Sequence, residues 1–174
     1  MQAPIEIERC VILGTVTGKG SLRVRDTVFL RGGVHADQGV PTLVNCVVPS
    51  VVARAGCELT RCTVLDTAML DAGDTRVAEC ILARLDSLPP AARIERCDIL
   101  SRRGAIQQRD LGGTCFSKNP QFRDPKSFDY RLKRTSPCRG KASDGGDIGC
   151  RYTPEMLEML KLAFELRKKG IIKF

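Results

Sequence analysis

The sequence predicts an all-β solenoid, in which the chain winds into about six to seven short coils stacked along one axis. Three observations support this fold: a motif that recurs at a nearly constant spacing, period-two alternation within the motif, and turn residues between its copies. The motif reads apolar, any, polar, Cys or Thr, any, apolar, and its fourth position falls at 10, 27, 46, 62, 80 and 97. Spacings of 16 to 19 residues leave no room for a helix in each coil, so we expect parallel strands that stack from coil to coil.

Each coil is expected to contain two or three short strands. The alternation in Ile7-Glu8 and Val24-Arg25 has the period of two that is typical of a strand. Turn signals such as Thr17-Gly18-Lys19-Gly20 separate the strands. The variable spacing favours a right-handed coil over the more regular left-handed form, and Cys115, 18 residues after Cys97, indicates a weaker seventh coil. A second apolar element follows the Cys or Thr position in five copies, at Val16, Val34, Val51 and Val52, Met69, and Leu85.

Five of the nine cysteines share one position of the repeat, namely Cys10, Cys46, Cys62, Cys80 and Cys97. We expect reduced thiols that pack in a file inside the solenoid. A disulfide or metal role is the alternative, since strands about 4.8 Å apart bring neighbouring cysteines within bridging range. A regular stack does not offer the side-chain geometry of a disulfide, and the chain has no Cys-x-x-Cys pair.

Unpaired thiols fit a reducing compartment better than an oxidising one. The N-terminus shows no signal-peptide pattern, and no apolar run approaches the roughly 18 residues of a membrane helix. We therefore expect a cytoplasmic protein, or one assembled from the cytoplasm, that makes no contact with a membrane.

The net charge of +8 lies almost entirely in the last third of the chain. Residues 1–114 hold 14 Lys/Arg and 13 Asp/Glu, a balance of +1, whereas residues 115–174 hold 14 and 7, a balance of +7. We therefore divide the chain into a β-helix over residues 1–150, with a terminal cap segment at about 115–150, and a C-terminal amphipathic helix over residues 151–174.

The cap segment carries a distinctive combination of short motifs. It contains Asn119-Pro120-Gln121-Phe122, Asp129-Tyr130-Arg131-Leu132, Ser136-Pro137-Cys138 and Asp144-Gly145-Gly146-Asp147-Ile148-Gly149. This combination resembles the end signature of right-handed parallel β-helix repeat proteins of the pectate-lyase-like superfamily, in their C-terminal portion. The resemblance implies that the segment closes the coil stack, with 129–132 as a last strand and 147–149 as a tight terminal turn. Because that superfamily includes both enzymes and non-enzymes, the resemblance leaves the activity open.

The final segment predicts one helix. Thr153 is a good N-cap and Pro154 suits the first helical position. The helix carries a broad apolar face. It either folds over the last coil and covers the exposed edge of that coil, or docks on a partner or a second copy of the chain. The face comprises Met156, Leu157, Met159, Leu160, Ala163, Phe164 and Leu166.

Candidate catalytic groups are few. Cleavage of polysaccharides requires paired carboxylates or a Ca²⁺ cluster of acids, and the nearest candidates are Asp66, Asp71 and Asp74. Asp71 and Asp74 lie in a turn, where aspartate is common for its own hydrogen bonding. Asp98 follows a cysteine of the file, so we expect it to point outward into solvent, and His35 reads as a loop residue without a nucleophile. We assign no catalytic, cofactor-binding or metal-binding residue and expect no cofactor.

The basic residues of the cap segment raise the possibility of a nucleic-acid interface, because Phe128 and Tyr130 lie close by in the sequence. Aspartates alternate with the basic residues, which favours an acidic protein surface as the partner over a nucleic acid. The basic residues in question are Arg131, Lys133, Arg134, Arg139 and Lys141.

The leading functional hypothesis is a non-enzymatic structural or interaction module, a β-helix rod end that docks on other subunits of a larger assembly such as a phage-tail-like or surface structure. The repeat begins almost at Met1 without a cap, so we expect either a partner on the open first coil or a longer natural chain. The partner would be another protein or a second copy, bound through the C-terminal helix and the open coil. The alternatives are a carbohydrate-active β-helix, whether a polysaccharide lyase or a hydrolase, and a scaffold that polymerises end to end.

Overall fold

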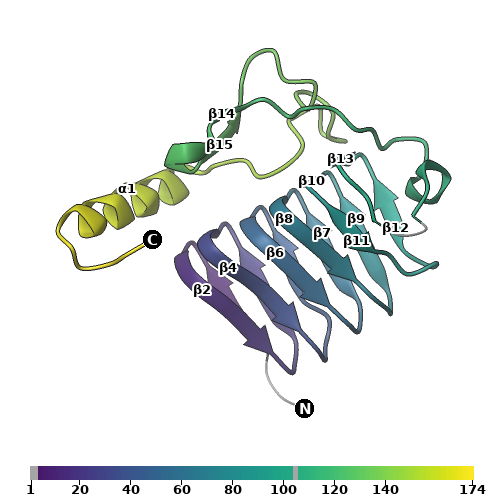
Figure 1. Ribbon diagram of the computed structural model, residues 1–174, viewed down its shortest axis with the longest axis horizontal. Coiled ribbons are helices and arrows are strands. Elements are labelled where there is room, and N and C mark those ends of the chain that lie inside the picture. Colours follow the sequence, from purple (N-terminus) through teal and green to yellow (C-terminus); the bar gives the residue numbers. More distant parts are fainter. Residues whose placement is uncertain (1–3, 104–105) are drawn as a thin grey trace.

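The computed structural model describes residues 4–103 and 106–174 and confirms a mostly β chain folded as a parallel solenoid (Figure 1). About six coils stack along the long axis, and each contributes one strand to each of two parallel sheets, A and B. Sheet A contains β1 (Ile5–Glu8), β3 (Leu22–Arg25), β5 (Thr42–Val44), β7 (Cys57–Thr60), β9 (Thr75–Ala78) and β12 (Arg93–Glu95). Sheet B contains β2 (Val11–Gly18), β4 (Val28–Ala36), β6 (Val47–Ala53), β8 (Thr63–Leu70), β10 (Ile81–Leu82) and β13 (Asp98–Ile99), and the short β11 (Leu85–Ser87) pairs with β8.

The apolar positions of the motif form continuous columns inside the solenoid. In sheet A, Val24 pairs with Leu43, and Leu43 pairs with Leu59. These three residues are at most 1% exposed. The hydrophobic core is therefore a stack of equivalent side chains, which explains why a short repeat alone predicts the fold.

The cysteine file is confirmed for four of its five predicted members, whereas Cys10 in the first coil is only partly buried. Cys46, Cys62, Cys80 and Cys97 are fully buried with free thiols. The backbone N–H of Cys62 donates to Sγ of Cys80 at 3.3 Å, and that of Cys80 donates to Sγ of Cys97 at 3.4 Å. Burial raises the pKa of the Cys46 and Cys80 thiols, so that both stay protonated. Thr27 occupies the same position in the second coil and is equally buried.

One residue per coil turns the chain from sheet A into sheet B. It immediately precedes the cysteine file and adopts a left-handed backbone conformation, with φ between 47° and 57°. This conformation is uncommon for residues other than glycine, although Asn and Asp tolerate it better than others. The six corner residues form a row along one edge of the solenoid: Arg9, Asp26, Asn45, Arg61, Glu79 and Arg96.

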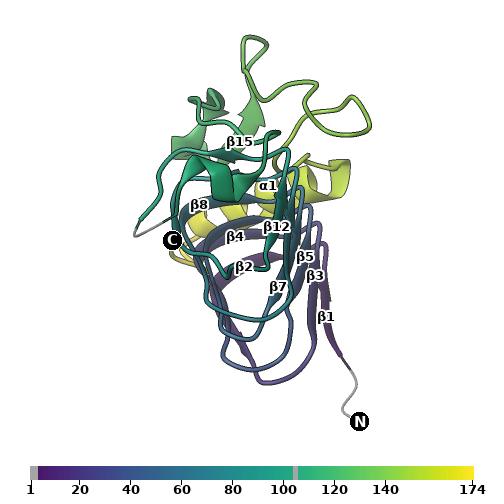
Figure 2. The same cartoon turned by 90° about the vertical axis from the view of Figure 1, so that its right-hand side faces the viewer.

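After the last coil the chain runs back along the outer face of sheet B, toward the first coils. We call residues 117–152 the return segment; Figure 2 shows this later part of the chain on one side of the stacked coils. Each of four side chains from successive coils accepts a backbone N–H of the return segment: Asp98 from Lys118 (2.8 Å), Glu79 from Ser143 (2.7 Å), Thr63 from Cys150 (2.9 Å) and Asn45 from Arg151 (2.7 Å).

This path corrects the expectation that the segment closes the coil stack. The strand β15 (Asp129–Leu132) pairs antiparallel with β14 (Phe122–Asp124) rather than with a coil, and η2 (Pro125–Ser127) connects the two. The tight turn expected at 147–149 lies on sheet B instead: Gly149 has φ of 79° and donates its N–H to the Glu79 carbonyl at 2.7 Å. A Cβ at Gly149 would meet the Ile81 side chain at 2.7 Å, so this contact requires glycine.

The return segment and the helix that follows it together cover an apolar outer face on sheet B. Val28 and Val47 point away from the interior, yet both are fully buried, and they share a hydrophobic cluster with Met156 and Leu160. Strands buried on both faces read as continuous apolar runs, and the runs Val11-Ile12-Leu13 and Val28-Phe29-Leu30 have that character.

The helix α1 (Pro154–Lys168) begins as predicted, with Oγ1 of Thr153 accepting the Met156 N–H at 3.3 Å and Pro154 at its first position. Its location corrects the expectation that it covers the last coil. It contacts β2 in the first coil, and Figure 1 shows that most of it extends beyond β2 along the solenoid axis. The C-terminal Phe174 folds back onto Phe128 and Phe164, with ring centroids 5.7 and 5.5 Å apart.

Candidate functional site

The first coil has an unpaired edge. In the part of the chain that the structure describes, β1 pairs only with β3 and β2 only with β4. The N–H groups of Ile5 and Arg9 bond to the second coil, at 2.9 and 3.1 Å from the carbonyls of Ser21 and Arg25. Because consecutive residues of a strand direct their backbone groups to opposite sides, the N–H groups of Glu6 and Glu8 point away from the stack.

The apolar columns are uncovered at this edge. Ile5 is 54% exposed, whereas its neighbour in register, Leu22, is 1% exposed. Ile7, Ile12 and Val16 are likewise only partly buried. An edge strand with an exposed apolar side and free backbone groups is a template for pairing with another strand.

The strand β2 itself carries no lysine or proline that would block such pairing. Its eight residues, Val11–Gly18, include no charged residue and no proline. Native proteins generally protect long edge strands with lysine, proline or a covering element. The outward-facing Leu13 on this strand is 36% exposed.

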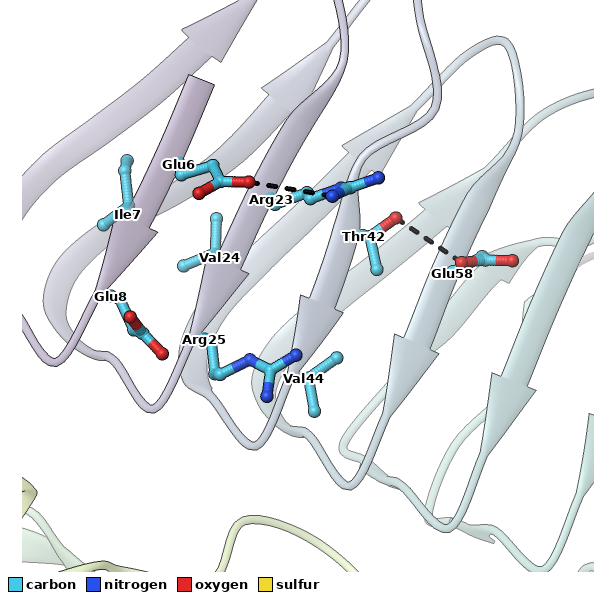
Figure 3. A pocket seen from close by; sticks show the side chains of 9 residues that line it. All are labelled: Glu6, Ile7, Glu8, Arg23, Val24, Arg25, Thr42, Val44 and Glu58. Atoms are coloured by element: carbon cyan, nitrogen blue, oxygen red, sulfur yellow. Dashed lines mark hydrogen bonds and ion pairs between the residues drawn. The ribbon is translucent and has the colours of Figure 1, made fainter. Parts of the chain in front are cut away.

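A polar hollow of about 400 Å³ lies on the outer face of sheet A beside this edge (Figure 3). Glu6 lies 3.6 Å from the Arg23 guanidinium, and Thr42 donates to Glu58 at 3.5 Å. The hollow therefore presents carboxylates and guanidinium groups together, and it can accept polar side chains of either charge. Its lining comes from the first four coils: Glu6, Ile7, Glu8, Arg23, Val24, Arg25, Thr42, Val44 and Glu58.

The other end of the solenoid is covered by the chain itself. The short helix η1 (Gln108–Leu111) contacts β12. Leu111 is 1% exposed, and Cys115 continues the cysteine file at 8% exposure. Phe116 forms a bridge with Asp98, so the seventh coil predicted from Cys115 is present as a partial turn. Among residues 4–103 and 106–174 the two ends of the solenoid are thus unlike: no strand pairs with the outer edge of the first coil, whereas η1 and Leu111 cover the last.

The three carboxylates considered for carbohydrate chemistry are each paired with an arginine. Asp66 lies 3.5 Å from Arg84, Asp71 lies 3.5 Å from Arg54, and Asp74 lies 3.6 Å from Arg76. Each carboxylate therefore has a different arginine partner. In the described part of the chain, no group of three or more His, Cys, Asp or Glu residues is arranged to hold a metal ion.

His35 also lies in an ion-pair row. Its Nε2 is 3.1 Å from Oδ1 of Asp37, which also accepts from Nε of Arg54 at 3.0 Å. Asp71 also pairs with Arg54 and accepts a hydrogen bond from the Ser87 hydroxyl at 2.7 Å. The row links four coils through surface side chains.

Asp98 is the clearest correction among the candidate residues. The sequence predicts an outward, solvated side chain, but Asp98 is 0% exposed because the return segment covers it. It accepts from the Lys118 N–H at 2.8 Å and from the Cys138 thiol at 3.1 Å. Desolvation raises its pKa, although both hydrogen bonds oppose the shift. The sequence does contain a sign that this position is buried. At the position equivalent to Asp98, the first five coils have Val, Val, Val, Thr and Ile.

The aromatic residues near the basic cluster pack against the protein. Phe128 lies in the hydrophobic cluster under α1, and Tyr130 packs edge-on against Phe122 at 5.4 Å. Arg131 pairs with Asp129 through two hydrogen bonds of 2.8 Å. These aromatic rings are thus occupied in packing, whereas Lys133 and Arg134 are exposed.

No family model, curated protein or solved structure matches the chain. Within the described residues, no helix has the length and apolar character needed to cross a membrane.

Proposed function

We propose that this chain is a non-enzymatic interaction module, a solenoid rod end that docks on a second copy of itself through its open first coil. The observation that carries the proposal is the contrast between Ile5, 54% exposed, and its neighbour Leu22, 1% exposed. A strand added to this edge would bury the same columns that every later coil buries. That burial contributes roughly 25 cal/mol per Å² of apolar surface.

The choice of a second copy rests on the two unlike ends. A closed last coil offers no partner to an open first coil, so head-to-tail stacking is disfavoured, and two open ends can instead meet head to head. Because Val11–Gly18 holds no charge, β2 can pair antiparallel with its own copy without opposing like charges. A pair related by a twofold axis is closed and is the most common symmetry of soluble oligomers.

The helix α1 supports the same docking end. It lies beside β2 and extends past the first coil (Figure 1). Leu162 on this helix is 48% exposed, and Met159 and Leu166 are only partly buried. We propose that the open coil and the exposed flank of α1 together form the docking surface.

Light scattering coupled to size-exclusion chromatography tests this proposal with a matched pair of variants. Leu13 and Leu100 each follow a cysteine of the file by three residues and are 36% and 38% exposed, but they lie in the first and last coils. We expect a dimer for the wild-type chain, a monomer for Leu13→Lys and a dimer for Leu100→Lys. A wild-type monomer at all concentrations would contradict the proposal, as would filaments, which would favour the end-to-end scaffold.

We also infer a distant relationship to right-handed parallel β-helix proteins of the pectate-lyase-like superfamily, with the signature of their C-terminal portion. What supports this inference is the solenoid together with the combination of motifs from Asn119 to Gly149. The free thiol file supports a reducing compartment. A left-handed coil in an experimental density map would contradict the inferred relationship.

A further inference from the structure

A second hollow, of about 380 Å³, lies on the return segment and is lined by four arginines. They come from separate parts of the chain: Arg123 from β14, Arg131 from β15, Arg139 from the following loop, and Arg151 from the residues before α1. Convergence of four guanidinium groups is costly unless anionic groups neutralise them. The carboxylates nearby neutralise only part of this charge.

Two of the arginines are held in place by carboxylates. Arg131 makes a two-point pair with Asp129, and Arg151 makes a two-point pair with Asp144 at 2.7 and 2.8 Å. Arg151 also donates from Nε to the Asp147 carbonyl at 2.8 Å. These arginines are fixed in orientation, and each retains N–H donors that its carboxylate does not use.

The backbone around Arg151 is shaped to admit its guanidinium group. A Cβ at Gly146 would lie 2.7 Å from the Arg151 guanidinium carbon, so glycine allows the group to lie flat against the chain. The hydrogen bonds from Arg151 also lower the pKa of Asp144, which keeps that carboxylate ionised and the pair intact.

The other two arginines are held less tightly, and only Arg139 has a carboxylate within 4 Å among the described ion pairs. Among the described residues, neither the Arg123 nor the Arg139 guanidinium makes a hydrogen bond. The closest carboxylate oxygen to Arg139 is Oδ1 of Asp147, at 3.7 Å, and that oxygen already accepts the Gly140 N–H at 3.1 Å. Both arginines are exposed and line the hollow, so their guanidinium N–H groups are available to a ligand.

We propose that this hollow binds a phosphate-class anion. Arg123 and Arg139 would donate hydrogen bonds to the anion, and Arg131 and Arg151, which carboxylates hold in place, would add positive charge and further N–H donors. Planar guanidinium groups recognise phosphate oxygens through paired N–H donors, and the four arginines outnumber the carboxylates of Asp129, Asp144 and Asp147 beside them. The site is independent of the docking edge on the first coil. The basic residues of the cap segment led us to expect an acidic partner, and this proposal specifies a phosphate group as the acidic feature that is bound.

Isothermal titration calorimetry of the full chain with pyrophosphate tests the site. Succinate, an anion with carboxylates in place of phosphates, is titrated for comparison. We expect saturable binding of pyrophosphate and at least about tenfold weaker binding for Arg123→Gln and Arg139→Gln, because each removes a charge-assisted hydrogen-bonding group. The matched control is Arg134→Gln, which removes the same charge from an exposed arginine outside the hollow, and it should change the affinity less than about twofold, as general screening allows.

Three results would overturn the proposal: no saturable binding by the wild-type chain, an equal loss in Arg134→Gln, or succinate binding as tightly as pyrophosphate. Unfolding midpoints in urea accompany each variant. If a glutamine variant proves unstable, Arg123→Lys is used instead, because it keeps the positive charge and removes the paired N–H donors of the guanidinium group. Weaker binding by that variant supports the site, and unchanged binding contradicts the assigned role of the guanidinium.

Discussion

Two buried carboxylates anchor the return segment, and they respond to pH in opposite ways. Desolvation raises the pKa of Asp98 above its ordinary value of 3.8. Burial also tends to raise the pKa of Glu79, but hydrogen bonds from the hydroxyl and backbone N–H of Ser143 outweigh it and lower the pKa below 4.5. The contribution of Asp98 to stability is therefore greatest below pH 3.8 and is lost as the pH rises through its folded pKa. The contribution of Glu79 is present above pH 4.5 and is lost as the pH falls.

Substitution of Asp98 tests its buried role. Asp98→Asn keeps an oxygen for the Lys118 N–H and removes the cost of a buried charge, so at pH 7 we expect stability equal to or above that of the wild type. Asp98→Ala leaves that N–H unpaired and should lose about 1–3 kcal/mol. Urea unfolding at pH 7 measures both. A loss above about 2 kcal/mol in Asp98→Asn would show that the ionised carboxylate itself stabilises the fold.

Substitution of Glu79 tests the opposite pH dependence. Glu79→Ala removes two hydrogen bonds to Ser143, and we expect a loss of about 2 kcal/mol at pH 7. The loss should shrink at pH 3, because protonation weakens the same contacts in the wild type. Glu95→Ala, in an exposed position on β12, is the control and should change the unfolding free energy by less than about 0.5 kcal/mol. Equal losses at both pH values would rule out the assigned linkage.

The sequence cannot predict the anchoring residues by local pattern alone. Asn45 and Glu79 precede the cysteine file at positions that Arg occupies in three other coils, so no composition rule distinguishes them. Their partners Arg151 and Ser143 are 106 and 64 residues away. Contacts between residues so far apart in the sequence form only because the chain, after the last coil, runs along the outer face of sheet B.

At the scale of single elements, the first residue of α1 was predicted correctly, but the part of the solenoid that the helix contacts was not. Its start depends on Thr153 and Pro154, which act locally. Its location depends on the apolar outer face of sheet B, which becomes clear only when residues such as Val28 and Val47 are seen to be buried while pointing outward. Apolar residues on both faces of the strands were the available signal for a covered sheet.

A matched pair on α1 tests this packing. Leu160 is 6% exposed and Leu162 is 48% exposed. Leu160→Asp should lose at least about 3 kcal/mol, because it removes buried apolar surface and places a charge against sheet B. On the monomeric Leu13→Lys background, which removes any contribution from docking, Leu162→Asp should lose less than about 1 kcal/mol, mainly through helix propensity. Thermal unfolding at pH 7 measures both, and similar losses for the two variants would mean that α1 does not pack as described.

For the whole molecule, the repeat alone predicts the coil stack, because each coil contacts mainly its neighbours and repeats the same interactions. The paired apolar columns and the cysteine file follow directly from the spacing of the motif. The closed last coil is less predictable, since η1 and Leu111 lie outside the repeat. The unlike ends, one open and one covered by the chain, are what lead from the fold to a docking function.

The most direct test of that function is amide hydrogen exchange at Val11, on β2, as a function of protein concentration. The Cys10 carbonyl accepts the Val28 N–H at 3.0 Å, so the N–H of the next residue, Val11, points away from the stack. The account predicts fast exchange of this amide in dilute solution and increasing protection as two β2 strands pair. The N–H of Arg9, already bonded to the Arg25 carbonyl at 3.1 Å, serves as the internal reference and should stay protected throughout. A Val11 amide that exchanges rapidly at every concentration would contradict the central claim.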